Sequence, residues 1–261
     1  MTDGPEQALP GGRSQGAVRV GDTVRRPGQP WTPAVHALLA HLAAVGFEGA
    51  PRPLGYDDVG RAVVTYLPGQ VVAETLPWPP WIYSDAALDQ VGRWLRRLHD
   101  ATTGFVPPPD AVWFAGQSWR PGLICGHHDA APYNAVWSDG DLVGFVDWDT
   151  AGPSSRELDL AFVALTWVPM QAPRVVVPQG FHAFDDRPKR LQRLLDAYGF
   201  EGDRRAFPAS VAARARINAD AIRRLAAAGS PIGAGLLATA ADLDEAVREV
   251  EGAPAGYWER A

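Results

Sequence analysis

The chain has 261 residues, of which 46% are hydrophobic and 21% are charged, with a formal net charge of −6. This length and composition are those of a folded protein with one large or two small domains, and they exclude a disordered or fibrous chain. The negative balance gives the protein no general attraction for nucleic acid or for an anionic membrane surface.

Cysteine and lysine usage excludes several kinds of site. Cys125 is the only cysteine, so neither an internal disulfide nor a cysteine-rich metal site is available. Lys189 is the only lysine and lies in a polar run, which rules out a Walker-type phosphate loop. The longest apolar run, 160–170, is about half of a bilayer span, and the first residues have no apolar core. We therefore expect a cytoplasmic protein without a signal peptide or membrane helix.

The first third of the chain predicts a small antiparallel sheet and one helix. Residues 1–16 are rich in Gly and Pro and end in GGRSQG, a glycine loop. The β-prone runs AVRV and TVRR flank Gly21-Asp22, which is typical of a tight hairpin. A helix is predicted to begin at Thr32-Pro33 and to end at Gly46, with an apolar stripe formed by Val35, Leu38, Leu39, Leu42 and Val45.

A further strand and a boundary follow. Residues 61–67 predict a strand that ends at Pro68-Gly69, and the proline-rich stretch up to 83 favours irregular structure. We place a hinge at about 65–70, which divides the chain into an N-terminal lobe, 1–69, and a C-terminal lobe, 70–261.

The remainder of the chain is mostly helical. Ser84 is a suitable cap for a helix whose apolar stripe comprises Leu88, Val91, Trp94, Leu95 and Leu98. Further helices are predicted at 156–168, 187–199, 207–228 and 232–250. A strand-rich front part and a larger helical back part belong to the α+β class.

The densest chemistry lies between 125 and 159. Apolar runs on both sides of Ser138-Asp139-Gly140-Asp141 predict a hairpin, and pairing of Trp137 with Leu142 would place Asn134 opposite Phe145. Asp147 would then lie diagonally across the ladder from Asn134, within roughly 7–8 Å. An amide oxygen and a carboxylate without a thiolate suit Mg²⁺, which takes further ligands from water and phosphates.

Asp129 precedes Asn134 by five residues, with Pro132 between them opposing a continuous helix. We expect an irregular loop that presents both side chains inward. Asp129 could then accept or orient a hydroxyl proton while Mg²⁺ and basic residues offset the charge of a transferring phosphoryl group.

HHDAAPYN followed by FVDWD resembles the catalytic loop and metal motif of the aminoglycoside phosphotransferase and choline kinase-like enzymes, which share the protein-kinase fold. The resemblance implies a two-lobe fold, with Asp129 as catalytic base, Asn134 and Asp147 as Mg²⁺ ligands, and His127 as the histidine that positions the loop. His128 stands where glycine is common in the family.

Other segments extend the resemblance along most of the chain. LPGG is similar to the nucleotide loop, TVRRP to the phosphate-contact strand, and LRRLHD to the helix before the catalytic loop. VVTYLPG looks like the hinge that receives adenine, which implies Thr65 and Leu67 as nucleotide-binding residues. Asp159 resembles the family's helix-start aspartate that braces the catalytic loop.

The phosphate contact departs from the family pattern. Kinase-like enzymes hold the phosphates with a strand lysine paired to a helix glutamate, but this lobe has no lysine and residues 33–45 contain no glutamate. Arginine is the chemically sound substitute, since a guanidinium grips phosphate oxygens with two hydrogens. Arg25 aligns best with an arginine variant of the family strand, and Arg26, which shares a face with Val24, is the rival. Solvated edge-strand charges are the alternative for both residues.

These observations predict a Mg²⁺-dependent kinase that transfers the γ-phosphate of ATP or GTP to a hydroxyl of a small molecule. One alternative is a nucleotide-binding protein of the same fold with weak or no catalysis, motivated by the missing lysine and glutamate. Another is a hydrolase with a transition-metal cluster, built from His127, His128, Asp129, Asp147 and Asp149. Asp149 is otherwise a turn residue, a helix cap or a ligand of a second metal.

The acceptor is left open by the sequence. Aminoglycosides, other antibiotics, choline-like alcohols, sugars and homoserine are all acceptors in the family that the chain resembles. The last predicted helix carries an acidic set that is either a solvated face or an attraction for a cationic acceptor; its members are Asp242, Asp244, Glu245, Glu249 and Glu251.

Overall fold

The computed structural model describes residues 5–9, 16–73 and 76–259. Two compact units are present, one built from Met1–Glu74 with Arg97–Ser155 and the other from Thr75–Arg96 with Arg156–Ala261. Each unit is therefore made of two separate stretches of chain. The predicted lobes 1–69 and 70–261 and the hinge at 65–70 stay a prediction.

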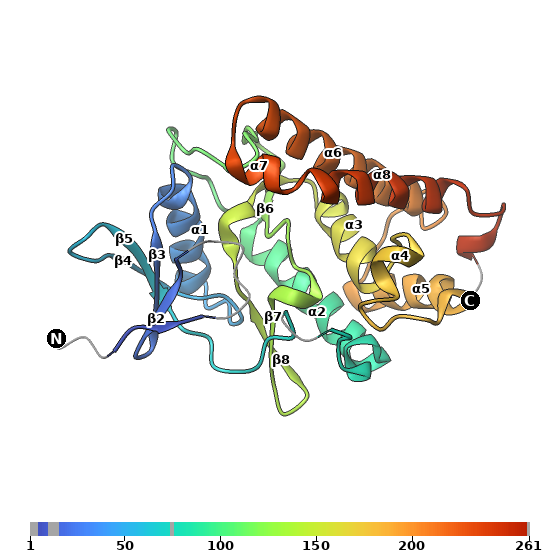
Figure 1. Cartoon of the computed structure of the whole chain (residues 1–261), viewed down its shortest axis with the longest axis horizontal. Helices are drawn as coiled ribbons and strands as arrows, with labels where there is room; N and C mark the ends of the chain where they lie inside the picture. Colours follow the sequence, from blue (N-terminus) through green and yellow to red (C-terminus); the bar gives the residue numbers. More distant parts are fainter. Residues whose placement is uncertain (1–4, 10–15, 74–75, 260–261) are drawn as a thin grey trace. The chain divides into compact units, whose positions relative to one another are not determined.

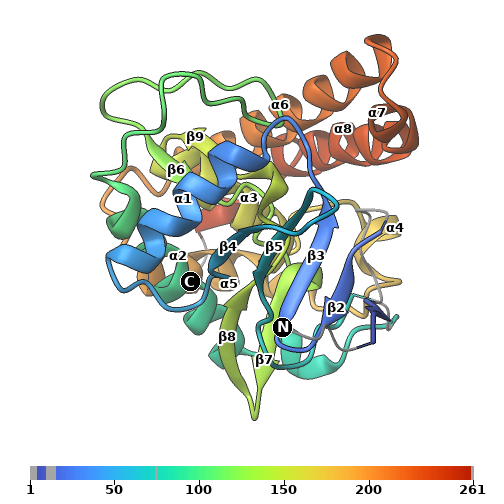
Figure 2. The same cartoon turned by 90° about the vertical axis from the view of Figure 1, so that its left-hand side faces the viewer.

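The first unit contains a five-stranded antiparallel sheet in the order β1-β2-β3-β5-β4 (Figures 1 and 2). Its strands are β1 Gln7–Ala8, β2 Val18–Val20, β3 Thr23–Pro27, β4 Pro53–Tyr56 and β5 Arg61–Thr65. The predicted hairpin at Gly21-Asp22 is confirmed, and Gly21 adopts φ +59°, which glycine tolerates without a steric penalty. The sequence patterns missed β1 and β4, both of which are short and partly or wholly exposed.

Helix α1, Thr32–Ala44, lies against β4 in the same unit (Figure 2). Val35, Leu38, Leu39 and Leu42 are buried as predicted, because their spacing places them on one helical face. Two details differ from the prediction. Val45 is 53% exposed because the helix has already ended, and the N-cap is Trp31, while the Thr32 hydroxyl accepts a hydrogen bond from the Gln29 amide.

Helix α2, Asp85–Thr102, is amphipathic and is capped as predicted, since the Ala87 amide donates to Ser84 Oγ. Its predicted apolar stripe is buried throughout. The helix belongs to the second unit up to Arg96 and to the first unit from Arg97.

Two short antiparallel strand pairs complete the first unit. Strand β6, Ile124–Gly126, pairs with β9, Gly152–Ser154, and β7, Ala135–Ser138, pairs with β8, Asp141–Phe145. The β7–β8 hairpin is fixed to earlier chain segments by close backbone contacts, and a Cβ on Gly144 would lie 2.2 Å from the Gly49 carbonyl oxygen.

The second unit is helical. Helices α6, Phe207–Ala227, and α8, Leu237–Glu251, lie side by side, and α6 also packs on α3, Arg156–Trp167 (Figure 1). The remaining helices are α4, Pro173–Val176, α5, Arg187–Tyr198, and α7, Pro231–Gly235. The helix predicted at 232–250 is thus two helices that meet at Leu236. No helix in the described part of the chain is long and apolar enough to cross a membrane.

The small antiparallel sheet and the helical unit confirm the predicted α+β class.

Candidate active site

The segment 127–134 connects β6 to β7 through a loop that ends in a 3-10 turn, Pro132–Asn134. His128 has φ +66°, a left-handed conformation that glycine adopts most readily. This backbone angle explains why glycine suits the position before Asp129. The loop is therefore irregular, as expected, with Pro132 opening the turn.

Asp129 is held by two side chains of its own loop. The Tyr133 hydroxyl donates a hydrogen bond of 2.6 Å to Asp129 Oδ1, and Asn134 Nδ2 donates bonds of 2.9 Å to Oδ2 and to the backbone oxygen of Asp129. These contacts fix the direction of a half-buried carboxylate. Tyr133 was missed by the sequence analysis, although a polar ring four residues after the aspartate, in a loop that turns back on itself, was the available signal.

His127 is a buried residue that holds this loop in position. Its ring is fully buried between Trp148, at 4.6 Å between ring centroids, and Phe145, at 5.9 Å. Nδ1 accepts a bond of 3.3 Å from the Asp129 amide, and Nε2 donates one of 3.1 Å to the Val146 oxygen. The ring thus connects the Asp129 loop to the segment that leads to Asp147, which is the role implied for it.

Asn134 and Asp147 come close together by a different register from the predicted one. Trp137 pairs with Leu142 as predicted, but a bulge at Val143 places Ala135, not Asn134, opposite Phe145. The Val146 amide instead donates a bond of 2.9 Å to the Asn134 oxygen, so Asn134 is bonded to the neighbour of Asp147. Asp147 lies beyond β8, with φ +60°.

The donor set at Asn134 and Asp147 fits a hard cation. The side-chain nitrogen of Asn134 donates to Asp129, so the side-chain oxygen of Asn134 can act as a ligand. The side chain of Asp147 is 31% exposed. An amide oxygen and a carboxylate are ligands that Mg²⁺ accepts together with water and phosphate oxygens. These two residues could therefore hold Mg²⁺.

The transition-metal alternative finds no support in the same region. His128 Nε2 bonds to the Gly152 oxygen at 3.0 Å, while His127 is committed to Val146, so the two imidazoles are directed at different backbone carbonyls. Among the described residues, no group of three His, Cys, Asp or Glu side chains is placed to hold a metal ion.

The two arginines of β3 point to different partners, because successive side chains of a strand alternate between its faces. Arg26 Nη2 lies 2.7 Å from Asp149 Oδ1, and its Nη1 lies 3.6 Å from Asp147 Oδ1. Arg25 Nη1 lies 3.8 Å from Asp57 Oδ2 instead. The structure thus brings Arg26, not Arg25, to the carboxylates of the metal motif.

The remaining sequence-predicted nucleotide residues are less closely connected to these groups. Thr65 ends β5, and its hydroxyl accepts a bond of 2.8 Å from the Arg52 amide. Leu67 follows the strand and is half-buried. The GGRSQG loop falls at 11–16, of which only Gly16 is among the described residues, and LPGG falls outside them except for Leu9.

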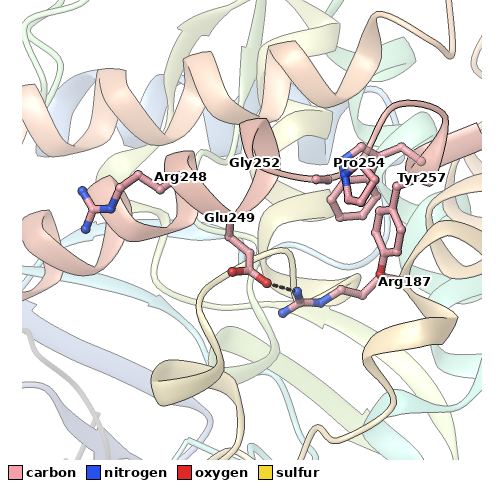
Figure 3. Close-up of a pocket in the computed structure, with 8 residues that line it drawn as sticks. Arg187, Arg248, Glu249, Gly252, Pro254 and Tyr257 are labelled. Atoms are coloured by element: carbon pink, nitrogen blue, oxygen red, sulfur yellow. Dashed lines mark hydrogen bonds and ion pairs between the residues drawn. The ribbon is translucent and has the colours of Figure 1, made fainter.

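In the second unit, Asp159 is buried in the first turn of α3. A pocket of about 270 Å³ also lies there, next to the end of α8 and lined by Arg187, Glu249 and Tyr257 among others (Figure 3). Figure 3 shows Glu249 directed at Arg187, and the two side chains are 2.9 Å apart. Among the lining residues, Glu249 belongs to the acidic set considered for a cationic acceptor, and the others were not predicted as site residues.

The acidic face of α8 is neutralised within the second unit. Arg174 pairs with Asp242 and Glu245, and three further ion pairs are Arg187 with Glu249, Arg216 with Glu251 and Arg223 with Asp244. The whole acidic set is thus paired with arginine, which leaves little net charge to attract a cationic acceptor.

Comparison with known proteins agrees with this geometry. The family model described as "Phosphotransferase enzyme family" matches residues 110–205, which include the Asp129 loop and the Asp147 motif. The trifolitoxin immunity protein of Rhizobium leguminosarum bv. trifolii is 35% identical over 205 residues, which are 77% of this chain and 76% of that protein.

Solved structures share the fold at low identity. A choline/ethanolamine kinase family protein from Mesorhizobium loti aligns at a TM-score of 0.58 and 18% identity, covering 96% of this chain and 93% of its own. Aminoglycoside 2'-phosphotransferase-IIIa, solved with GDP, aligns at 0.62 and 14%, covering 97% and 94%. Spectinomycin phosphotransferase, solved with ADP and spectinomycin, aligns at 0.60 and 11%, covering 94% and 92%.

These structures confirm the predicted kinase-like fold. With the family match and the 35% identical relative, they also confirm the enzyme class predicted from HHDAAPYN and FVDWD: the chain belongs to the phosphotransferase enzyme family and is a small-molecule phosphotransferase.

Proposed function

We propose that the chain transfers the γ-phosphoryl group of ATP or GTP to a hydroxyl group of a small molecule, in a Mg²⁺-dependent reaction. The observation that carries this proposal is the continuous set of contacts through Asn134. Its side chain bonds to Asp129, and its backbone bonds to the residue before Asp147. One residue thereby connects the proposed base to the proposed cation ligand.

The roles follow from what each group offers. Asp129 faces the acceptor hydroxyl and orients it, because its carboxylate is held in one direction by Tyr133 and Asn134. Asn134 and Asp147 hold Mg²⁺, which when bound offsets the charge of the transferring phosphoryl group. Arg26 contacts the phosphates with its guanidinium, a group that remains charged at all relevant pH values.

The donor and the location are part of the same proposal. Neighbours of this fold were solved with GDP or ADP, which supports a purine nucleotide as donor. We place the reaction in the cytoplasm, where nucleotides are supplied and where a buried thiol such as that of Cys125 stays reduced.

The acceptor class is suggested by the relatives. One relative is named for immunity to trifolitoxin, and solved neighbours are named for aminoglycosides, spectinomycin and macrolides. These names support a toxin or antibiotic that carries a free hydroxyl. Amino alcohols, sugars and nucleosides remain in the test set because the choline/ethanolamine kinase neighbour has the same fold.

The test is a coupled nucleotide-consumption screen of the purified protein with Mg²⁺ against those acceptors. Wild type is expected to consume nucleotide with at least one acceptor, whereas Asp129→Ala binds nucleotide but does not transfer. Asp139→Asn is the matched control, since this exposed hairpin carboxylate accepts a hydrogen bond from the neighbouring Ser138 hydroxyl and its loss is expected to leave turnover unchanged. Full turnover by Asp129→Ala would refute the assigned role.

A further inference from the structure

Arg26 needs an anchor that helix α1 does not provide. The helix carries no acidic residue, and its ionisable side chains are His36 and His41. His41 Nε2 is engaged with the Ala101 oxygen at 2.9 Å. Burial, together with the charge of Arg26, lowers the pKa of His36. This histidine cannot act as the counterion in either protonation state, because a neutral imidazole carries no charge and an imidazolium is itself a cation.

Two carboxylates reach Arg26, and they are not equivalent. Asp149 Oδ1 is in direct contact with the guanidinium at 2.7 Å, and the Asp149 side chain is 18% exposed. Asp147 Oδ1 is more distant, at 3.6 Å, and its side chain is 31% exposed. The Arg26 side chain is itself only 12% exposed, so its charge is poorly screened and depends on a close partner.

The local backbone keeps both carboxylates at this arginine. Trp148, which lies between them, is buried and donates its indole N–H to the Phe145 oxygen at 2.8 Å. The 3-10 turn Trp148–Thr150 begins at this anchor, and the Thr150 hydroxyl bonds to the His127 oxygen at 3.0 Å. Asp149 is therefore held on a segment fixed at both of its neighbours.

We propose that Asp149 is the positioning residue that anchors Arg26 for nucleotide phosphate, in place of a carboxylate on helix α1, and that it thereby leaves Asp147 available to the cation. This inference rests on the proposed function, which makes Arg26 the phosphate contact. It assigns to the second carboxylate of the DWD motif a partner in the protein, not a second metal ion.

The assignment predicts whether loss of the Asp149 carboxylate strengthens or weakens nucleotide binding. Removing a carboxylate near a polyphosphate site strengthens binding by charge alone. If Asp149 anchors Arg26, Asp149→Asn instead weakens binding, because the guanidinium is released toward Asp147. ADP binding measured by calorimetry in EDTA isolates this effect, since no divalent cation is present and no acceptor is needed.

In EDTA, Asp149→Asn is expected to weaken ADP binding by roughly threefold or more. In the Arg26→Met background the same change is expected to leave binding unchanged or to strengthen it. The proposal is overturned if Asp149→Asn binds ADP as tightly as wild type, or if it weakens binding equally in both backgrounds.

The second unit offers a matched control pair, because Arg193 also lies between two aspartates, at 2.9 Å from Asp85 and 2.7 Å from Asp89. Arg193→Met and Asp89→Asn are expected to leave ADP affinity unchanged. A wild-type protein that binds none of ADP, ATP, GDP and GTP, with or without Mg²⁺, would refute the proposed function and this inference with it. Binding by wild type with additive effects of the two site variants refutes the inference alone.

A second pair of variants covers the case in which Asp149→Asn does not fold. Arg26→Lys shortens the cation's reach and is expected to weaken ADP binding, and Asp149→Glu, with one more methylene, is expected to restore part of that loss in the lysine background. Failure of the longer carboxylate to restore any affinity in a folded double variant contradicts an anchoring contact.

Discussion

Individual side chains around the proposed base are held by short hydrogen bonds from within the loop. The shortest runs from the Tyr133 hydroxyl to Asp129 Oδ1, at 2.6 Å. A hydrogen bond to a charged group is worth about 1.5–3 kcal/mol, and here it also sets the direction of the carboxylate. Tyr133 is therefore expected to affect the reaction through Asp129, without touching the substrate itself.

Tyr133→Phe removes this hydroxyl and keeps the ring. We expect kcat to fall about tenfold while the KM for nucleotide stays unchanged, because the carboxylate loses its orientation but the nucleotide contacts remain. Steady-state kinetics with the acceptor found in the screen measures both constants. Tyr257→Phe is the control, since it removes a comparable hydroxyl bond of 2.8 Å to the Phe184 oxygen in the second unit. A rise in KM at constant kcat would contradict the role given to Tyr133.

For single residues, the sequence indicated which residue types form the site, but it could not decide which of two adjacent arginines reaches the carboxylates. HHDAAPYN and FVDWD contain every carboxylate and amide of the site. Arg25 was preferred over Arg26 by similarity to a family strand, yet Arg26 is the residue that reaches Asp147 and Asp149. Which face of a strand meets a distant loop depends on tertiary packing, and no pattern in TVRRP contains that information.

Among the elements, the β7–β8 hairpin is the most important for the proposed function, because Asn134 precedes it and Asp147 follows it. Its docking depends on close backbone approach at Gly144, whose hypothetical Cβ would meet Gly49 backbone atoms at 2.2–2.5 Å. The Phe145 amide donates to the Gly49 oxygen at 3.1 Å in the same contact. Backbone atoms cannot rotate away as a side chain can, so there is no room for a side chain larger than that of glycine at position 144.

Gly144→Ala is expected to destabilise the protein by about 2–3 kcal/mol, the cost of forcing a methyl group into a packed contact. Urea unfolding followed by tryptophan fluorescence gives the change in the free energy of unfolding. Gly104→Ala is the control, because a Cβ there meets no atom within 4 Å. Equal stability of the two variants would show that the hairpin does not depend on this approach.

The hairpin also illustrates what periodicity can and cannot predict. The turn at Asp139-Gly140 and the Trp137–Leu142 pair followed from residue type and alternation. The bulge at Val143 did not, because one extra residue in a strand leaves the apolar run unbroken while shifting the register beyond it. The same limit applies to the last helix, which was predicted as one piece although its chain breaks at Leu236 between α7 and α8.

For the molecule as a whole, composition and patterning predicted the α+β class and most of the helices, since long amphipathic stretches such as α2 leave little choice of structure. The division into compact units was less accessible. Residues 97–155 are grouped with the N-terminal sheet, and residues 75–96 with the later helices. Long-range contacts of this kind, such as Gln70 with Trp137, leave no local trace in the sequence.

His36 gives the stability of the protein a specific pH dependence. Its pKa in the folded protein is lowered, chiefly by burial and next by the charge of Arg26, below the value of 6.5 that applies in an unfolded chain. Unfolding therefore takes up a proton in the window below 6.5. Stability from this group is complete above that pH and is lost as the pH falls through it.

As the pH is lowered from about 7.5 to about 5.5, the free energy of unfolding of wild type is expected to decrease more steeply than that of His36→Gln. These pH limits lie about one unit on either side of the pKa of histidine in the unfolded chain. Urea titrations at several pH values measure both slopes. His182→Gln, at an exposed position, is expected to keep the wild-type slope. Identical slopes for wild type and His36→Gln would mean that the histidine is equally protonated in both states.

The central claim is that a phosphoryl group moves from nucleotide to an acceptor hydroxyl at Asp129. In the most direct measurement, nucleotide with an isotopic label in its γ-phosphoryl group is incubated with the protein, Mg²⁺ and the acceptor identified in the screen. The compound that carries the label after the reaction is then identified. We predict that wild type places the label on the acceptor as a phosphomonoester and that Asp129→Ala does not. Label that stays on the nucleotide, appears only as inorganic phosphate, or reaches the acceptor equally with Asp129→Ala would contradict the account.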